Sequence, residues 1–291
     1  MRLRERFIPW LLLAPALAVL AVLFGTSIVY GVAQSLGYLT FIGQRTLTFA
    51  AYERILIGPS PIATEFWSSL GFSLWVSAAS TLLAAAGALG VAVVATGRRE
   101  AGPTGIFLLH LNLAVPHLVW AIALSLFLAQ SGLLARIAAA LGWIATPADF
   151  PVLVRDRYGV GIILDYVTKE IPFLTLILLA ILRSQPRTYN VIAENLGATA
   201  WQRLRYVTFP LVRPGLLAGS LLVFAFIFGA YEVPAILGVR FPRTVAALAL
   251  DFFLNPDLQQ RAEGMAISVI MAMVVVVVAV GGYWLNERQT R

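Results

Sequence analysis

The chain has 291 residues, of which 60% are hydrophobic and only 12% are charged, and its mean hydropathy is +0.86. Soluble domains are roughly 45–50% apolar and about 25% charged, so this composition excludes an ordinary soluble protein and indicates an integral membrane protein. The chain contains no Cys, which excludes disulfide frameworks, thiol nucleophiles and Cys-ligated metals.

Six apolar runs have the length of about 20 residues that crosses a hydrocarbon core of about 30 Å. In chain order they cover residues 7–28, 70–96, 105–130, 160–182, 215–234 and 266–285. The first run is longer than the ~7–15 apolar residues of a cleavable signal peptide, so we expect a retained span there. The sequence therefore predicts an all-α, polytopic membrane protein with six transmembrane helices.

The net charge of +7 is explained by where the basic residues lie. Lys169 is the only Lys, and the other basic residues are Arg. If the N-terminus is cytoplasmic, twelve Arg fall in the inner segments 1–6, 97–104, 183–214 and 286–291, and eight fall in the outer segments. Positive residues favour the cytoplasmic side, so we expect both termini there, and no nucleic-acid partner is needed.

The inner segment 183–214 is of mixed polarity and lies between two apolar runs. Pro186 and Pro210 bracket it, and each disfavours helix in the residue before it. Gly197 predicts the end of a first short helix, because it adopts a left-handed conformation without steric cost. Thr199 and Gln202 have the spacing of a capping box, which predicts the start of a second helix.

In this second helix Trp201, Leu204 and Thr208 would share one face at helical spacing. One interpretation is an interfacial amphipathic connector anchored by Trp and Arg. The other is a docking element that inserts an apolar anchor into a cytoplasmic partner. The residues alone leave both interpretations open.

The segment resembles the cytoplasmic signature of permease subunits of binding-protein-dependent ABC importers with the type I importer fold. That signature runs Glu-Ala-Ala, three residues, Gly, nine residues, Ile-x-Leu-Pro. Here Gly197 is followed by nine residues and then Val207-Thr208-Phe209-Pro210, whereas Val191-Ile192-Ala193 stands in place of Glu-Ala-Ala. The flanks, Lys169-Glu170-Ile171-Pro172-Phe173 and Phe228-Gly229-Ala230-Tyr231-Glu232-Val233-Pro234, resemble the branch that imports polyamines, thiamine and ferric ion.

The resemblance covers roughly residues 66–286 and implies three parts. Residues 1–65 would hold the first transmembrane helix and an outer loop, residues 66–286 a permease core of five helices with the coupling loop 183–214, and residues 287–291 a cytoplasmic tail. It also implies a location in the bacterial inner membrane and a transport subunit that is not itself an enzyme.

The resemblance further implies the partners of the chain. They are two cytoplasmic ATPase subunits, a second permease that is either distinct, as we expect, or identical, a periplasmic or lipid-anchored solute-binding protein, and membrane lipid. The sequence has no phosphate-cradling GxxxxGK[ST] loop, so ATP and Mg²⁺ would be used by the partner ATPase and no cofactor is expected on this chain. The residues expected to couple to the ATPase are Glu194, Gly197, Ala198, Trp201, Leu204 and Pro210.

Ionisable residues inside the apolar runs are the candidates for a substrate path, because charges in a bilayer usually face a cavity or a partner. Asp165 and Lys169 are four residues apart and could pair on one helix face, so self-neutralisation and a path lining both stay open for them. Glu170 has no local partner in the sequence, and Glu232 lies at the outer end of the fifth run and is either a path residue or a solvated helix end. Acidic groups along a path would suit a cationic, polyamine-like cargo.

His110 and His117 are seven residues apart, which would place them on one face of a continuous helix, two turns apart. No third metal ligand can be assigned, so we expect helix-packing or path roles for the two histidines rather than a metal site, with His117 as a candidate for the substrate path. Pro116 predicts a kink beside His117, and Asn112 could hydrogen-bond across helices.

Two other function classes have sequence signatures of their own. An ion-gradient-driven secondary transporter often shows internal repeats and paired broken helices, and no repeat is found in this sequence. An intramembrane enzyme would need a catalytic motif, and neither HExxH nor a Ser–His pairing is present.

Overall fold

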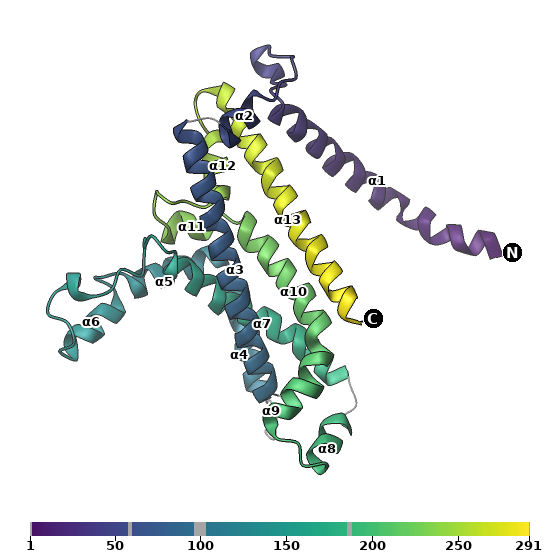
Figure 1. Cartoon of the computed structure of the whole chain (residues 1–291), viewed down its shortest axis with the longest axis vertical. Coiled ribbons are helices and arrows are strands. Elements are labelled where there is room, and N and C mark those ends of the chain that lie inside the picture. The colour runs from purple at the N-terminus through teal and green to yellow at the C-terminus, as the bar shows by residue number, and fades with distance from the viewer. Residues whose placement is uncertain (1, 58–59, 96–102, 185–187, 291) are drawn as a thin grey trace. The chain divides into compact units, whose positions relative to one another are not determined.

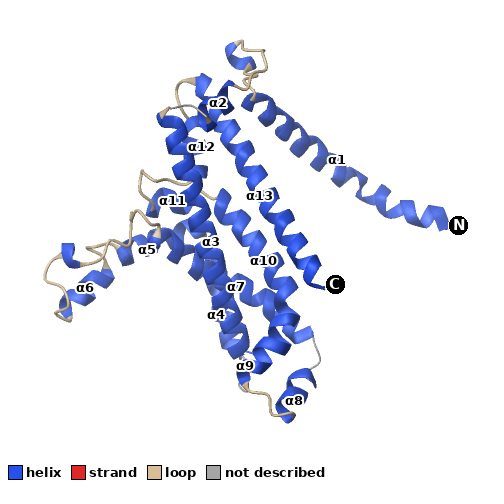
Figure 2. Ribbon diagram, viewed as in Figure 1, coloured by secondary structure: helices blue, strands red, loops and turns tan. Residues whose placement is uncertain are grey.

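The computed structural model describes residues 2–57, 60–95, 103–184 and 188–290. These residues form helices joined by loops and no β-sheet (Figures 1 and 2). The longer helices are α1 (Arg2–Ser35), α3 (Pro61–Ala95), α4 (Pro103–Ala114), α5 (His117–Leu128), α7 (Val160–Ser184), α10 (Phe209–Gly229) and α13 (Arg261–Thr290). The shorter ones are α2 (Ala50–Leu56), α6 (Leu133–Ala140), α8 (Thr188–Asn195), α9 (Ala200–Arg203), α11 (Glu232–Leu237) and α12 (Val245–Phe253).

Five helical stretches of the described chain are long and apolar enough to cross a membrane: Leu12–Ser35, Pro61–Ala95, His117–Ala140, Ala200–Gly229 and Leu258–Trp284. The protein is therefore a multi-pass membrane protein. Helix α7, which coincides with the fourth predicted run, carries Asp165, Lys169, Glu170 and Arg183 and is not among the five.

The third predicted span, residues 105–130, is not one kinked helix. Helix α4 ends at Ala114 and α5 begins at His117, with Pro116 in an extended conformation at φ −59° and ψ 144°. The argument that His110 and His117 share a helical face is therefore wrong, because they lie on different helices. The short inner turn predicted at 97–104 falls, apart from its last two residues, outside the described residues, as does Pro186.

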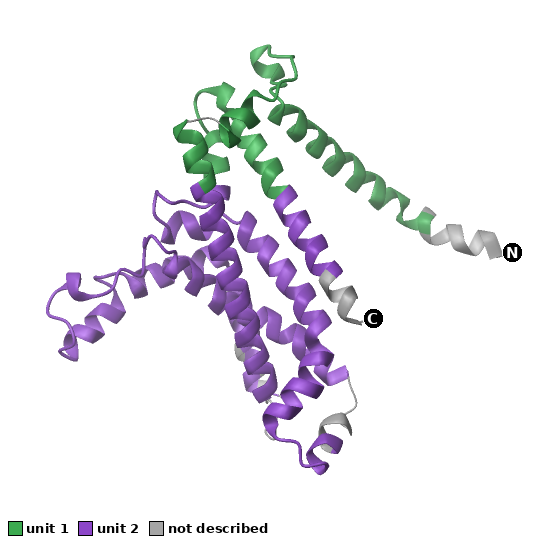
Figure 3. Ribbon diagram, viewed as in Figure 1, with its two compact units in different colours: residues 1–67, 248–272 green, residues 68–247, 273–291 purple. Residues whose placement is uncertain are grey.

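The chain divides into two compact units, residues 1–67 with 248–272 and residues 68–247 with 273–291 (Figure 3). In the second unit, α7 packs against α4, α5, α10 and α11. Small residues permit close packing there: a Cβ added at Gly219 would lie 2.8 Å from Leu174 Cδ2, and one at Gly87 would lie 2.6 Å from Ile171 Cδ1. The buried side chains of α3, α7 and α10 form one apolar cluster.

The first unit contains an ion pair between α2 and α13. Arg54 Nε donates to Glu263 Oε1 at 2.7 Å, and Arg54 Nη2 lies 2.6 Å from the same oxygen. The Glu263 side chain is buried, whereas half of the Arg54 side chain is exposed. Arg261 lies over the rings of Phe41 and Phe253, at 5.1 and 4.7 Å from their centroids.

A short loop before α7 has its own local stabilisation. Asp149 accepts hydrogen bonds from the Thr146 amide at 2.7 Å, the Thr146 hydroxyl at 3.1 Å and the Ala145 amide at 3.1 Å. These bonds favour the carboxylate and lower the pKa of Asp149.

Candidate functional site

Helix α8 ends at Gly197 in the way the sequence predicts. Gly197 has φ +80°, its N–H donates to Glu194 O at 2.9 Å, and the Ala198 N–H donates to Ala193 O at 2.9 Å. This pair of bonds is a Schellman motif, which satisfies carbonyls at a helix end and requires a left-handed residue. The expected end of the first short helix is confirmed.

Helix α9 begins with the predicted capping box. The Thr199 N–H donates to Gln202 Oε1 at 2.8 Å, and the Gln202 N–H donates to Thr199 Oγ1 at 3.3 Å. Two backbone donors are thereby satisfied reciprocally. Residues 188–203 consequently form a helix–turn–helix in which both helix ends adjoining the turn have local caps; we call this segment, together with residues 204–208 that follow it, the hook.

The hook exposes large apolar side chains. The exposed fractions are 82% for Leu196, 67% for Trp201 and 70% for Tyr206, whereas Leu204 is half-buried. Glu194 pairs with Arg203 across the turn, with Oε2 3.1 Å from Nη1. This ion pair joins α8 to α9 and gives Glu194 a role within the chain that its sequence position did not indicate.

Pro210 does not end the hook's second helix, contrary to the prediction. Residues Leu204–Thr208 form a π-helix between α9 and α10, and Phe209 is helical at φ −63° and ψ −47° with Pro210 in the first turn of α10. A π-turn is wider than an α-turn and changes the face on which later residues lie. Trp201 and Thr208 accordingly differ in exposure, so the predicted shared face is also wrong.

At the break beside Pro116, a side chain of α7 supplies the hydrogen-bond donor that the backbone lacks. In a continuous helix the Asn112 carbonyl would accept from residue 116, but proline has no N–H. The Lys169 ammonium group donates instead to Asn112 O at 2.5 Å and to Val115 O at 2.6 Å. Lys169 is 2% exposed, so a buried charge is used to cap the end of α4.

At a second proline, Pro172 in α7, a side chain of α4 replaces the missing backbone donor. Helix α7 continues through Pro172, which removes the donor that would reach the Thr168 carbonyl. Asn112 Nδ2 donates to Thr168 O at 3.1 Å, and Trp120 Nε1 donates to Thr168 Oγ1 at 2.8 Å. The cross-helix hydrogen bond expected of Asn112 is therefore present.

His117, Asp165 and Glu170 lie together next to this junction. His117 Nδ1 is 4.0 Å from Asp165 Oδ2, and His117 Nε2 is 3.7 Å from Glu170 Oε1. Asp165 is fully buried, and neither of its carboxylate oxygens has a hydrogen-bond partner among the described residues. The pairing of Asp165 with Lys169 that the spacing allows is thus not a hydrogen bond, because the ammonium group is directed to carbonyls of α4.

Two aromatic rings lie beside His117. Its ring centroid is 5.0 Å from that of Phe226 and 6.2 Å from that of Tyr166. Glu232 is exposed in the first turn of α11, which packs against α5 and α7. In the part of the chain that the structure describes, no group of three or more His, Cys, Asp or Glu residues is arranged to hold a metal ion.

The family of binding-protein-dependent transport system inner membrane components matches residues 106–291. The chain belongs to this family. It is a permease component of ABC importers, with the helical fold of the type I importer permeases.

Two curated relatives illustrate the similarity in sequence. The permease is 29% identical over 226 residues to the inner membrane ABC transporter permease protein YnjC of Escherichia coli, covering 75% of this chain and 42% of YnjC. It is 28% identical over 156 residues to the thiamine transport system permease protein ThiP of Brucella abortus, covering 53% of this chain and 27% of ThiP. The permease therefore spans less than half the length of either relative.

A solved structure extends the similarity over the whole chain. A bacterial ABC transporter that imports the acidic polysaccharide alginate contains a chain that matches with a TM-score of 0.80 and 16% identity, covering 100% of both chains. At this identity the match establishes the fold.

Some candidate residues were missed by reading the sequence. Leu196 and Tyr206 add to the exposed apolar surface of the hook. The exposure of Leu196 could have been predicted from the sequence, because this residue directly precedes Gly197 at the turn. The capping role of Lys169 has no local signal, because the carbonyls it binds belong to a distant helix.

Proposed function

We propose that the chain is the transmembrane permease subunit of an ATP-driven importer, in which the hook docks a separate cytoplasmic ATPase. The observation that carries the proposal is the continuity of the hook with a membrane-spanning rod, since residues Ala200–Gly229 run as one helical stretch. A helical rod transmits a displacement along its axis because its backbone hydrogen bonds are satisfied internally. Closure of an ATPase dimer would move α9 and so move α10.

The exposed surface of the hook supplies the docking contacts. Trp201 and Leu204, with Leu196 and Tyr206, offer apolar anchors of the kind that dominate binding energy at interfaces. Gly197 and Ala198 form the turn that presents them, and Pro210 lies inside the rod, in the first turn of α10. Glu194 stabilises the hook through its ion pair with Arg203, which joins α8 to α9.

We infer that a complete importer contains two ATPase subunits, a second and distinct permease, and an external binding protein. ATP and Mg²⁺ would be bound by the ATPases. The hook would lie on the cytoplasmic side, with both termini of this chain on the same side, in accord with the larger share of Arg in the inner segments.

We further infer a path for a small cationic solute beside His117, with Asp165, Glu170 and Glu232 as its acidic groups. Lys169 is the one ammonium group of the cluster, and two backbone carbonyls occupy two of its three donors. A buried carboxylate without a donor is costly, so a cation passing Asp165 would be favoured there. A polyamine is the cargo class that fits this balance of charge.

The test of the coupling role is replacement of Gly197. The residue has φ +80° and open space around its Cβ position, so Gly197→Val strains the turn by roughly 1–2 kcal/mol without a clash. We expect the variant to insert into the membrane but to lose transport. The amount of ATPase that co-purifies with it should be less than about a tenth of the amount that co-purifies with the unaltered chain.

Gly142→Val is the matched control, since Gly142 also has positive φ and open space but lies in the loop after α6. It should keep both the ATPase and transport. Normal transport and ATPase co-purification by Gly197→Val would contradict the docking role. Uptake that survives ATP depletion but collapses with an ionophore would contradict the importer itself.

The cargo class has a separate test. In vesicles that carry the full importer, we expect Asp165→Asn to reduce ATP-driven uptake of labelled spermidine, used as the probe polyamine, at least about tenfold. Asp257→Asn, which alters an exposed loop carboxylate, should not. Uptake of spermidine that is equal in both variants would contradict a cationic path while leaving the importer function intact.

A further inference from the structure

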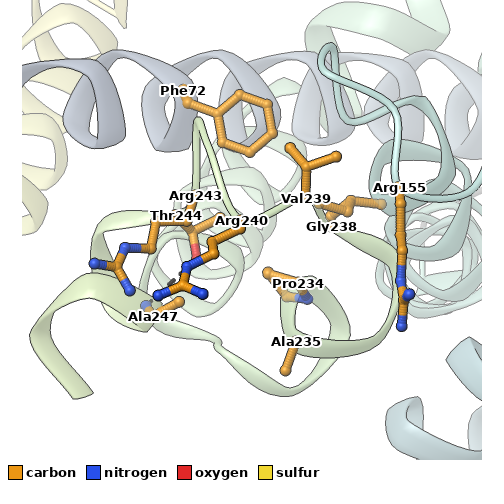
Figure 4. A pocket seen from close by; sticks show the side chains of 11 residues that line it. Phe72, Arg155, Pro234, Ala235, Gly238, Val239, Arg240, Arg243, Thr244 and Ala247 are labelled. Atoms are coloured by element: carbon orange, nitrogen blue, oxygen red, sulfur yellow. Dashed lines mark hydrogen bonds between the residues drawn. The ribbon is translucent and has the colours of Figure 1, made fainter. Parts of the chain in front are cut away.

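A cavity of about 440 Å³ in the second unit is lined by three arginines (Figure 4). They are Arg155, Arg240 and Arg243, and Thr244, Phe72 and Pro234 also contribute to its wall. Among the described residues that line the cavity, none is acidic. The cavity is thus a concave site with a concentration of positive charge, and the substrate path does not use any of these arginines.

Hydrogen bonds of the backbone hold the segment that carries Arg155 in place. Arg155 has φ 57°, a left-handed conformation that is uncommon for a residue with a Cβ. Its N–H donates to the carbonyl oxygen of Leu237 at 2.7 Å, which ties the segment before α7 to the end of α11. The neighbouring Asp156 is buried and accepts from the Tyr158 N–H at 2.8 Å.

The other two arginines lie on the segment between α11 and α12. This segment is anchored at its far end, where the Val245 N–H at the start of α12 donates to Ser73 Oγ on α3 at 2.7 Å. Arg240 is exposed and Arg243 is half-buried. Two chain segments about 85 positions apart therefore bring their guanidinium groups to one cavity.

The cavity and the hook lie at opposite ends of the same two helices. Helix α7 begins just after Arg155 and ends before the hook, whereas α10 begins at the hook and ends before α11 and the cavity (Figure 1). The 21 residues of α10 correspond to roughly 30 Å at 1.5 Å per residue. If the hook meets the cytoplasmic ATPase, the cavity opens on the external side of the membrane.

Guanidinium groups bind carboxylates through paired, charge-assisted hydrogen bonds. A cationic cargo would be repelled by three arginines, so the cavity is not suited to receive it. The complementary ligand is an acidic group that belongs to another molecule at the external face. Of the components of an importer, the binding protein is the one that meets the permease on that face.

We propose that Arg155 and Arg240, at the cavity that Arg243 also lines, form a socket that receives carboxylate side chains of the external binding protein. The proposal rests on the importer function inferred above and identifies where its external partner docks. Charge pairs at such a surface act mainly on the rate of association and on its dependence on salt.

The experiment uses the complete importer in lipid nanodiscs and the purified binding protein of the same importer. The rate of association is measured at low and high NaCl for Arg155→Gln/Arg240→Gln and for Arg240→Glu. We expect the rate at low salt to fall at least about tenfold in both variants, and the difference between low and high salt to become smaller. Arg157→Gln is the matched control, because Arg157 lies two positions from Arg155 but contacts the ring of Tyr158 instead of the cavity.

Arg155→Lys/Arg240→Lys keeps the charge and should retain most of the association rate, which separates loss of charge from misfolding. An unchanged association rate in Arg240→Glu would overturn the proposal. Loss of uptake with unchanged association would also overturn it, because it would assign the arginines to an anionic cargo. ATPase co-purification is measured on the same samples, so a failure of the importer function is recognised independently of the socket.

Discussion

Asn112 on α4 and Lys169 on α7 each donate a hydrogen bond to the helix of the other residue. Each of these bonds replaces a backbone donor that a proline removes from that helix. Lys169 on α7 donates to the Asn112 carbonyl, which Pro116 leaves without its helical partner, and Asn112 on α4 donates to the Thr168 carbonyl, which Pro172 leaves without its own. Broken backbone within a membrane is tolerated where neighbouring groups satisfy it. The two prolines and the two polar side chains therefore form one reciprocal junction between α4 and α7.

The junction predicts that a change at Asn112 depends on Pro172. Asn112→Leu leaves the Thr168 carbonyl without a donor, and we expect a loss of about 0.5–2 kcal/mol in the free energy of unfolding, as for other hydrogen bonds between membrane helices. Pro172→Ala restores a backbone N–H to that carbonyl. In the Pro172→Ala background the loss from Asn112→Leu should therefore be clearly smaller, as measured by thermal unfolding of the purified protein. An equal loss in both backgrounds would show that Asn112 acts through packing alone.

Gly219 predicts a packing limit between α7 and α10. A Cβ there would lie 2.8 Å from Leu174 Cδ2 and 3.1 Å from Ile177 Cδ1, so a large side chain must push these helices apart. We expect Gly219→Leu to destabilise the protein by about 1–3 kcal/mol, which is typical of overpacking, with a lower Tm. Gly229→Leu on the same helix meets open space and should leave Tm within a few degrees. A similar Tm for the two variants would refute close packing at Gly219.

The ion pair of the first unit predicts an asymmetry between single and double variants. Arg54→Gln leaves the buried carboxylate of Glu263 without its guanidinium group, at an expected cost of about 1–3 kcal/mol. This is less than the ~3–5 kcal/mol for a fully buried pair, because half of the Arg54 side chain is exposed. Arg54→Gln/Glu263→Gln removes the buried charge as well and should recover most of the lost Tm. A double variant no more stable than Arg54→Gln would contradict this account.

The parts of the fold that follow from neighbouring residues were predictable. The turn at Gly197 and the capping box of Thr199 and Gln202 both formed as expected, because their hydrogen bonds connect residues at most five positions apart. Apart from the third, the long apolar runs also became long helices, since a backbone in a bilayer must satisfy its hydrogen bonds internally.

The effects of the prolines were not predictable in the same way. Pro116 interrupts the expected third span, Pro172 leaves α7 continuous, and Pro210 lies inside the rod that it was expected to precede. The outcome depends on whether a side chain of another helix replaces the lost donor, or whether a π-turn precedes the proline. Neither condition can be read from the residues beside the proline.

The sequence by itself determined that this is a helical membrane protein and that a capped hook lies between two of its apolar runs, because hydropathy and local backbone chemistry depend on residues that are neighbours in the chain. Only the tertiary structure decided that His117 meets Asp165 and Glu170, that Lys169 caps α4, and that Arg155 shares a cavity with Arg240 and Arg243. These groups come from separate helices and loops, so their meeting depends on how the helices pack and on which small residues, such as Gly219, allow close approach.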